Sequence, residues 1–240
     1  MSFASSNRTA LRVVKETVFG QTPATPTLTP LRYTGESLNY SLSNITSNEI
    51  RDDRMTSDLV QVQSDAAGDV NIEMSYDAFD MLLEGALAST FSVAVAISAA
   101  DISAAAADNS YNSTTTDFTA ENISVGQWLK VSGFTGDTAN NGLARVVSVA
   151  ATKLVVAGIT LVDDAAGETV VMAGSMLRNG QALTSYTLQK HLQDATTPTF
   201  FNFNGSRVGG LNLQFQTGQI VTGSFNFMAL GASVSEAQFA

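Results

Sequence analysis

Alternation of apolar and neutral polar residues is the feature that most restricts how this chain can fold. It runs through residues 37–43 and 69–76, and it returns at 185–189, 211–216 and 221–227. Side chains two residues apart lie on the same face of a β-strand, so this period predicts half-buried strands. The chain is therefore expected to be mainly β, with extensive polar faces.

Composition narrows the possible functions. Charged residues make up only 14% of the chain, well below the usual quarter, while hydrophobic residues make up 44%. The net charge of −10 argues against ordinary DNA binding, which needs cations to neutralise phosphates. It does not argue against a surface past which DNA slides without sticking.

Several classes of site and location are expected to be absent. The sequence has no cysteine, so it offers no disulfide or thiolate metal site. Residues 1–14 lack the apolar run of a secretory signal, and no segment is long and apolar enough to span a membrane. We therefore expect a protein that folds in a cytoplasm.

Two long segments are expected to lie outside the core. Residues 1–32 contain Pro23, Pro26 and Pro30, which favour extended backbone, and they are interpreted as an N-terminal arm. The polar stretch Asn44–Gly68 is interpreted as a long hairpin arm or loop, because loops of this length are usually functional.

One helix is predicted, over residues 76–88. Phe79, Leu82, Leu83, Ala86 and Leu87 follow the spacing of a buried stripe. Ser75 or Asp77 is expected to cap its start, and Gly85 weakens it by roughly 1 kcal/mol relative to alanine.

The composition changes after this helix. Residues 92–110 are rich in Ala and Ser, and residues 117–173 have alternation and turn signals of their own, including Asn141-Gly142. Segment 92–174 is therefore predicted to be an inserted β domain. The core, residues 33–91 and 175–240, is predicted to be a sandwich or part-barrel with one flanking helix.

No residue pattern supports catalysis or a cofactor. His191 is the only histidine, so a catalytic triad or a multi-histidine metal site cannot form. The acidic run at 163–168 lacks the alternating oxygen ligands of a calcium loop and reads as a hairpin turn. Asp77, Asp80 and Glu84 are interpreted as a solvated helix face.

Two interpretations of Trp128 remain open. It is interpreted first as part of the core of the small inserted domain. The alternative is a partner or a sugar-stacking residue.

The order of several segments resembles that of siphophage major tail tube proteins, although no single motif is specific. The similar segments are Lys15–Pro26, Leu31–Leu38, Glu49–Met55, Gly68–Glu84, Thr184–Lys190 and Gly218–Phe225. The resemblance covers roughly residues 10–90 and 175–240. Segment 92–174 matches nothing in the core of that family and looks like a decorative domain that some members insert.

The resemblance implies a structural virion protein, assembled in the host cytoplasm, rather than an enzyme. Its subunits would form stacked, six-fold rings whose sheets join into a barrel around a lumen, which conducts DNA during ejection. Its partners would be further copies of itself, the tape measure protein, the tail terminator and distal tail proteins, with DNA only in transit. The insert would lie on the outer surface.

The polar sides of the strands supply the lumen candidates, and the long hairpin supplies inter-subunit candidates. The predicted lumen-facing residues are Asp69, Asn71, Glu73, Thr187, Gln189, Thr222 and Ser224. The predicted inter-subunit loop residues are Arg51, Asp52, Asp53 and Arg54.

Two other functions remain open from the sequence. The inner tube of a contractile tail or injection system would share the fold and differ by its sheath partner. A carbohydrate-binding β-sandwich would explain Trp128 and the Ser, Thr and Asn content, but it predicts a monomer and an export signal.

Overall fold

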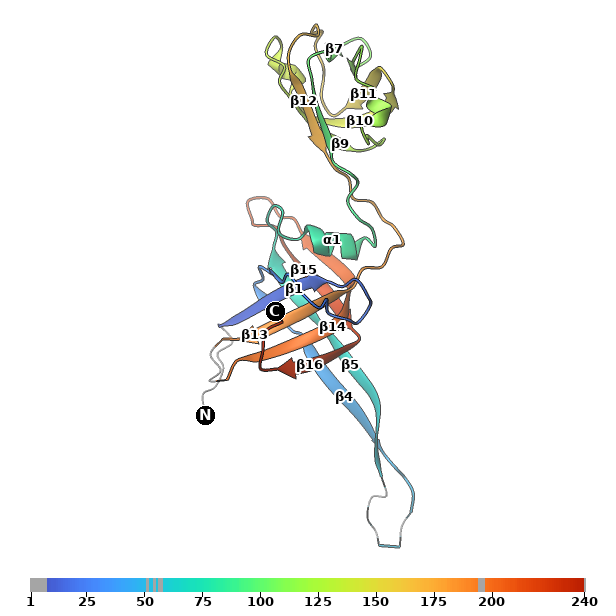
Figure 1. Ribbon diagram of the computed structural model, residues 1–240, viewed down its shortest axis with the longest axis vertical. Helices are drawn as coiled ribbons and strands as arrows, with labels where there is room; N and C mark the ends of the chain where they lie inside the picture. The colour runs from blue at the N-terminus through green and yellow to red at the C-terminus, as the bar shows by residue number, and fades with distance from the viewer. Residues whose placement is uncertain (1–7, 51, 54, 56–57, 194–196, 240) are drawn as a thin grey trace. The chain divides into compact units, whose positions relative to one another are not determined.

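The chain folds into two compact units, each with its own hydrophobic core (Figure 1). The computed structural model describes residues 8–50, 52–53, 55, 58–193 and 197–239. The core unit comprises Met1–Ser89 and Asn179–Ala240, and the insert unit comprises Thr90–Arg178. The insert thus begins slightly before, and ends slightly after, the segment expected from composition.

Antiparallel pairing organises the core unit into a mainly β fold with one helix. Its strand order is β2-β1-β13-β14-β15-β5-β3, with β16 also pairing β14 and β4 also pairing β5. The strands are β1 (Thr9–Lys15), β2 (Thr29–Pro30), β3 (Gly35–Glu36), β4 (Asn39–Thr46), β5 (Leu59–Glu73), β13 (Tyr186–Leu192), β14 (Thr199–Gln214), β15 (Thr222–Ala229) and β16 (Gly231–Ser235). The helix is α1 (Asp80–Ala86).

Strand β14 bends between two sheets that together form a sandwich. Its first half, up to Ser206, pairs β13 on one side and β16 on the other. Its second half, from Arg207, pairs β15, which in turn pairs β5. Gly205, with φ +64, lies between the halves, in a conformation that few other residues adopt. One long strand therefore belongs to both sheets.

The core lies between the two sheets and is closed by α1. The two sheets, the helix and the segments next to them contribute Leu11, Val13, Leu31, Ala66, Val70, Ile72, Phe79, Leu82, Tyr186, Leu188, Phe203, Phe225 and Phe227. The Phe79 and Phe225 rings are 6.0 Å apart, which joins the helix start to β15. Aromatic pairs of this kind stabilise a core beyond the area that they bury.

The N-terminal segment differs from the expected arm. Residues 9–15 form β1, which pairs β13 in register from Thr9 with Leu192 to Lys15 with Tyr186. Leu11 and Val13 are buried in the core. The prolines restrict only the later part of the segment, where β2 is a two-residue edge strand ending at Pro30. The prediction of an extended arm over 1–32 was therefore wrong for residues 9–15.

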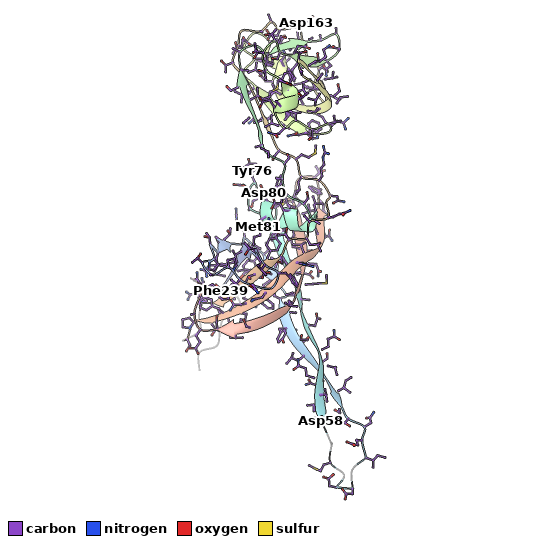
Figure 2. The ribbon with its side chains drawn as sticks, turned by 45° about the vertical axis from the view of Figure 1, so that its right-hand side comes forward. Asp58, Tyr76, Asp80, Met81, Asp163 and Phe239 are labelled. Atoms are coloured by element: carbon purple, nitrogen blue, oxygen red, sulfur yellow. The ribbon has the colours of Figure 1, made fainter. Side chains whose placement is uncertain are left out.

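The helix is shorter than predicted because left-handed residues bound it. Asp77 has φ 62 and Ala88 has φ 47, and neither conformation continues a right-handed helix. Phe79 occupies the N-cap without a side-chain hydrogen bond, so neither Ser75 nor Asp77 caps α1. Figure 2 shows Asp80 and Met81 at its first turn.

Gly85 has a packing reason in the middle of α1. A Cβ at this position would lie 2.6 Å from the buried Tyr186 hydroxyl, which donates a hydrogen bond to the Met81 carbonyl. The glycine lets the helix approach β13 closely. Its cost in helix propensity is therefore offset by the packing of Tyr186.

The insert unit is a seven-stranded antiparallel sheet rolled around its own core. The strand order is β6-β12-β9-β10-β11-β8-β7. The strands are β6 (Val95–Ala99), β7 (Ser103–Ala105), β8 (Ser110–Asn112), β9 (Trp128–Ser132), β10 (Gly142–Ala150), β11 (Lys153–Ala157) and β12 (Val170–Gly174), with 3-10 turns at Phe118–Ala120 and Thr138–Asn140. Tyr111 and Phe134 stack in the core, with ring centroids 5.8 Å apart.

Trp128 does not belong to that core. Strand β9 alternates exposed and buried residues, and Trp128 falls on the exposed side with 50% of its surface open. The alternating neighbours Leu129 and Val131 are the buried ones. The interpretation of Trp128 as a core residue was therefore wrong. The presence of one large aromatic residue does not indicate which face of its strand is buried.

Carboxylates organise the loops of the insert. Asp101 Oδ2 accepts hydrogen bonds from the Ser113 hydroxyl and from the backbone of Thr115 and Thr116. The hydrogen bond from the Ser113 hydroxyl, followed by those from Thr115, holds the pKa of Asp101 well below its usual range. This carboxylate therefore stays ionised and fixes the turn that follows β8.

Candidate self-assembly surfaces

One face of the sheet formed by β4, β5, β15 and the second half of β14 gathers most of the predicted lumen residues. Thr222 of β15 lies opposite Glu73 of β5, and Ser224 lies opposite Asn71. Asn226 follows opposite Asp69, and its amide donates a 2.9 Å hydrogen bond to the carboxylate. Directly paired residues point to the same face, while Phe225, Phe227, Val70 and Ile72 point to the core.

This polar face extends over the neighbouring strands. Asn212 and Gln214 of β14 lie opposite Ser224 and Thr222. On the other side Asn39, Ser41 and Ser43 of β4 lie opposite Ala67, Asp65 and Gln63 of β5. A shallow groove of about 320 Å³ on this face is lined by residues that include Thr34, Asn71, Asn212, Gln214, Thr222 and Ser224.

The charge of the polar face is negative. Asp65, Asp69 and Glu73 are its charged residues on β5, and the facing segments of β4, β14 and β15 carry no lysine or arginine. Arg207 lies at the far end, opposite Met228, but its guanidinium is 4.2 Å from the centre of the Phe19 ring. A phosphate polymer would find no free cation along these strands.

Two strand edges of this sheet are open among the described residues. The second half of β14 pairs only β15, and β4 pairs only β5. Unpaired edge groups are templates for pairing with another chain. Because β14, β15, β5 and β4 alternate in direction, β4 of one subunit would pair antiparallel with β14 of a second subunit.

The long hairpin carries an exposed apolar stripe. Beyond Ala66, strands β4 and β5 leave the core and continue as an arm, and Asp58 in Figure 2 marks the outer end of β5. The register places Tyr40, Leu42, Ile45, Val60 and Val62 on the side that continues the core face. These side chains are 40–59% exposed. We call this set the arm stripe.

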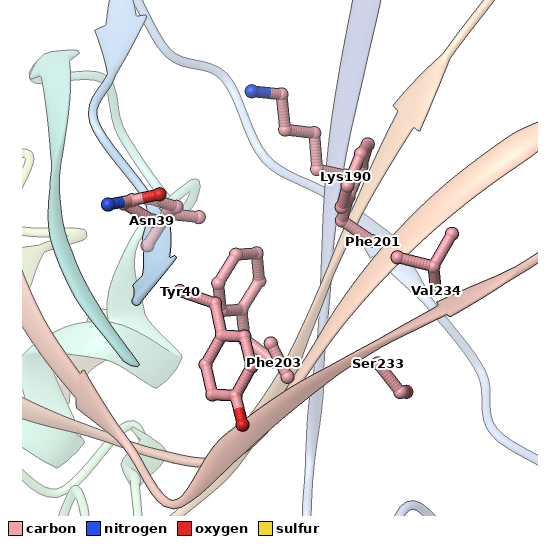
Figure 3. A pocket seen from close by; sticks show the side chains of 9 residues that line it. Asn39, Tyr40, Lys190, Phe201, Phe203, Ser233 and Val234 are labelled. Atoms are coloured by element: carbon pink, nitrogen blue, oxygen red, sulfur yellow. The ribbon is translucent and has the colours of Figure 1, made fainter. Parts of the chain in front are cut away.

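A cavity of about 330 Å³ opens at the root of the arm stripe (Figure 3). Tyr40 and Phe203 lie beside each other at its wall, and Phe201, Val234 and Lys190 border it. Its lining comes from Leu38 and from β4, β13, β14 and β16. The apolar surface of the arm therefore leads into a hollow in the sandwich.

Sequence reasoning missed the arm stripe and this cavity. Leu59-Val-Gln-Val-Gln63 alternates in the sequence, but the surrounding polar residues led to an interpretation of 44–68 as a polar stretch. Alternation at both ends of the stretch was the available signal.

Two predicted lumen residues are buried and do not belong to the polar face. Thr187 donates a 2.8 Å hydrogen bond to Glu16 Oε1, and Gln189 donates a 2.9 Å hydrogen bond to Asn202. Both side chains are fully buried, because residues after β1 and near the C-terminus cover that side of β13. Their assignment to the lumen was therefore wrong.

Glu16 anchors this covered side. Its carboxylate also accepts 2.8 Å hydrogen bonds from the backbone N–H groups of Gly205 and Gly20. Burial raises the pKa of Glu16, but hydrogen bonds from Gly205, Ser185, Thr187 and Gly20 outweigh it, so the pKa falls below its usual value. The carboxylate therefore joins the segment after β1 to β13 and β14.

Two of the four inter-subunit loop candidates, Asp52 and Asp53, lie in the described part of the segment between β4 and β5. Asp52 and Asp53 are exposed, and Asp53 accepts a hydrogen bond from the Met55 N–H. Arg51 and Arg54 lie outside the described residues. The described part of the tip therefore presents carboxylates to solvent.

The other candidate chemical groups have structural surroundings. His191 stacks on Phe200 with ring centroids 4.2 Å apart, and burial and then the charge of Arg12 lower its pKa. Asp163, Asp164 and Glu168 accept hydrogen bonds from backbone N–H groups of neighbouring loops. Among the described residues no group of His, Asp and Glu is arranged to hold a metal ion.

Asp77 and Asp80 are exposed, whereas Glu84 lies 3.5 Å from the Lys15 ammonium. Within the described ranges no helix has the length and hydropathy needed to cross a bilayer.

The fold and these surfaces define a mainly β protein with open strand edges among its described residues. The family model for phage tail tube proteins matches residues 6–240. The chain belongs to the phage tail tube protein family.

Solved structures give a weaker likeness. A chain in the "Cryo-EM structure of the anti-feeding prophage (AFP) baseplate, 6-fold symmetrised" is 7% identical, with a TM-score of 0.46. The alignment covers 98% of this chain and 97% of that chain. No curated protein matches the sequence.

Proposed function

We propose that the protein polymerises as stacked hexameric rings into the tail tube of a siphophage and forms the conduit for DNA ejection. The observation that carries this proposal is the open β14-β15-β5-β4 sheet, with its acidic polar face and two unpaired edges. Joining β4 of one subunit to β14 of the next removes both edges and closes a barrel.

The polar face is the proposed lumen wall. Asp69, Asn71, Glu73, Thr222 and Ser224 share it, and the charges that β5 contributes to it are all carboxylates. Repulsion between these carboxylates and phosphates would keep DNA from adhering during transit. In this arrangement the core faces of the same strands point away from the lumen.

The arm stripe is the proposed contact with a neighbouring subunit. A hairpin of two strands is at best marginally stable in water, and this one exposes a row of large apolar side chains. A second subunit would remove the stripe from water and fill the cavity beside Tyr40. Asp52 and Asp53 at the tip, with Arg51 and Arg54, would then contact that subunit.

A tube with two ends and a fixed length needs proteins that close its ends and set its length. We propose that the tape measure protein, the tail terminator and distal tail proteins bind the assembled rings. The protein would reside in the virion after assembly in the host cytoplasm. No cofactor is proposed.

Electron microscopy of the purified protein tests this function together with its lumen. The wild-type protein should form hollow tubes in negative stain, with six-fold end views. The variant Asp69→Lys/Glu73→Lys should still form tubes, because both side chains project from a polar face. Virions that carry it should eject DNA more slowly, because lysines would bind passing phosphates.

The control for this variant is Glu121→Lys/Glu236→Lys, which makes the same change of charge away from the polar face. It should leave ejection at the wild-type rate. Persistent monomers of the wild-type protein at high concentration would contradict the proposed tube. Equal ejection rates for the two double variants would contradict the lumen assignment.

We also propose that the insert lies on the outer surface and is dispensable for polymerisation. The connections to the insert lie side by side in the core unit, where Gly180 N–H donates to Leu87 O and Ala182 N–H to Ala88 O. A short Gly/Ser linker from Ser89 to Asn179 should therefore replace the insert without moving the core unit.

The deletion protein should unfold cooperatively and still form tubes of normal diameter, apart from the lost outer projections. The measurements are circular dichroism and negative-stain microscopy. A folded deletion protein that forms no tubes would show that the insert takes part in assembly.

A further inference from the structure

The outward face of the insert's sheet carries a solitary aromatic residue between two cations. On β9, Trp128 and Lys130 are exposed while Leu129 and Val131 fill the core. Arg145 of β10 lies directly opposite Trp128, and Leu143 lies opposite Lys130. Directly paired residues have Cβ atoms about 4.5–5.5 Å apart, and diagonal pairs such as Lys130 and Arg145 about 7–8 Å.

The indole is held in place by a glycine. A Cβ on Gly158 would lie 2.9 Å from Trp128 Cη2, so the ring packs against bare backbone just after β11. Gly158 has φ +84, a conformation that favours glycine. Half of the Trp128 side chain still faces solvent. The ring is therefore a supported platform rather than a freely rotating side chain.

The two cations on this face are free to bind a ligand. The insert unit has four cationic residues. Lys153 pairs with Asp108, and the Arg178 guanidinium contacts Met176 Sδ and the Val125 carbonyl. Lys130 and Arg145 form no ion pair within the described part of the chain, and both are exposed.

Acidic residues surround this face but do not lie on it. Each of the unit's aspartates and glutamates lies outside the strands β6–β12, in turns and loops. Apart from Arg145, the exposed positions of the adjoining strands are apolar or neutral, among them Leu143, Val147, Val171 and Ala173. The face thus combines an apolar platform with local positive charge in a unit that is acidic elsewhere.

We propose that this face binds an acidic polysaccharide, with Trp128 stacking on a sugar ring and Lys130 and Arg145 pairing with carboxylates of the polymer. The negative face of an indole attracts the polarised C–H groups of a sugar, and the ring's apolar area is covered. Charge-assisted hydrogen bonds from the two cations fix the orientation. The ligand surface is independent of tube formation.

Charge density distinguishes a polysaccharide from a nucleic acid. A duplex carries one negative charge per about 1.7 Å and needs many cations to release its counterions. Two cations among acidic loops do not meet that requirement. A polysaccharide with widely spaced carboxylates needs only a few ion pairs, and its sugar rings can stack on the indole.

The chain contains a built-in reporter for this test, because Trp128 is its only tryptophan. Titration of the full-length protein with hyaluronan should change the intensity and wavelength of tryptophan emission in a saturable way. Dextran, which has no carboxylate, should cause at most a tenth of the effect at equal sugar concentration. High salt should weaken the response to hyaluronan.

Variants then locate the contact. Lys130→Ala/Arg145→Ala should weaken hyaluronan binding at least tenfold and leave the unfolding midpoint unchanged, because both side chains are exposed. Lys153→Ala is the matched control, which removes a cation of the same unit that is already paired with Asp108. It should bind as the wild type does. Trp128→Ala, measured by calorimetry, should lose binding at least tenfold.

Three results would each overturn the proposal. The first is no change of Trp128 emission with hyaluronan. The second is equal affinity of the wild type and the Lys130→Ala/Arg145→Ala variant. The third is single-stranded DNA binding as tightly as hyaluronan, which would identify a general anion surface.

Discussion

Replacing Leu42 and Val62 together by aspartate should abolish tube formation and leave the monomer folded. The two side chains lie on the arm stripe, are 49% and 52% exposed, and make no part of the core cluster. Their substitution therefore costs the isolated subunit little. In an assembled tube the same positions would be buried, where an unpaired carboxylate costs several kcal/mol. Two such groups per subunit should prevent measurable polymerisation.

The measurement counts tubes by negative stain and compares thermal unfolding by circular dichroism. The matched control is Ser41→Asp/Gln63→Asp, which adds the same charge on the opposite face of the same arm. It should assemble at close to the wild-type yield. Wild-type yields from Leu42→Asp/Val62→Asp would show that the arm stripe is not an assembly contact. Equal loss in both variants would show that the arm acts without a preferred face.

Strand parity could be read from the sequence where one face of a strand meets solvent. In β5 and β15 the residues expected to face away from the core do so, because Val70, Ile72, Phe225 and Phe227 are buried. Apolar alternation carries this information directly, since the free energy of burial separates the two faces.

The same reasoning failed where both faces of a strand are covered. In β13 the residues Tyr186 to Gln189 are all buried, although they alternate in the sequence. Thr187 and Gln189 satisfy their polar groups with Glu16 and Asn202, which come from other strands and loops. Polar residues at alternating positions therefore indicate that one face of the strand has hydrogen-bond partners. These partners can be other protein groups rather than water.

Long-range pairing was also beyond the sequence. Alternation near 211–216 predicted a strand but not that β14 begins at Thr199 and enters a second sheet. The bend of β14 between the two sheets lies at Gly205, whose backbone N–H donates a hydrogen bond to Glu16. A local pattern cannot show a partner that is 189 residues away.

The helix illustrates how a backbone conformation overrides side-chain spacing. The stripe from Phe79 to Leu87 predicted a helix, but the left-handed Asp77 delays its start and the left-handed Ala88 ends it. Within the stripe, Leu82 is 1% exposed, whereas Leu83 is only partly buried. Spacing placed both on the core side, but adjacent residues of a helix point about 100° apart, and only Leu82 is fully buried.

This difference predicts that Leu82→Ala will destabilise the core unit far more than Leu83→Ala. Leu82 lies in the core cluster with Phe79, Tyr186 and Phe225, so its removal leaves a cavity that neighbours on two sheets cannot fill. The expected cost is about 2–5 kcal/mol in the free energy of unfolding. Leu83→Ala should cost less than about 2 kcal/mol, because part of that side chain already contacts solvent.

Urea unfolding followed by two signals measures this difference. Circular dichroism reports both units, whereas the emission of the single Trp128 reports the insert, which has a separate core. Leu82→Ala should lower the midpoint of the core unit and leave the Trp128 transition where it is in the wild type. Val131→Ala, a truncation at a buried position of the insert, should do the reverse. Equal costs for Leu82→Ala and Leu83→Ala would show that α1 packs on the sheet through a different face from the one described.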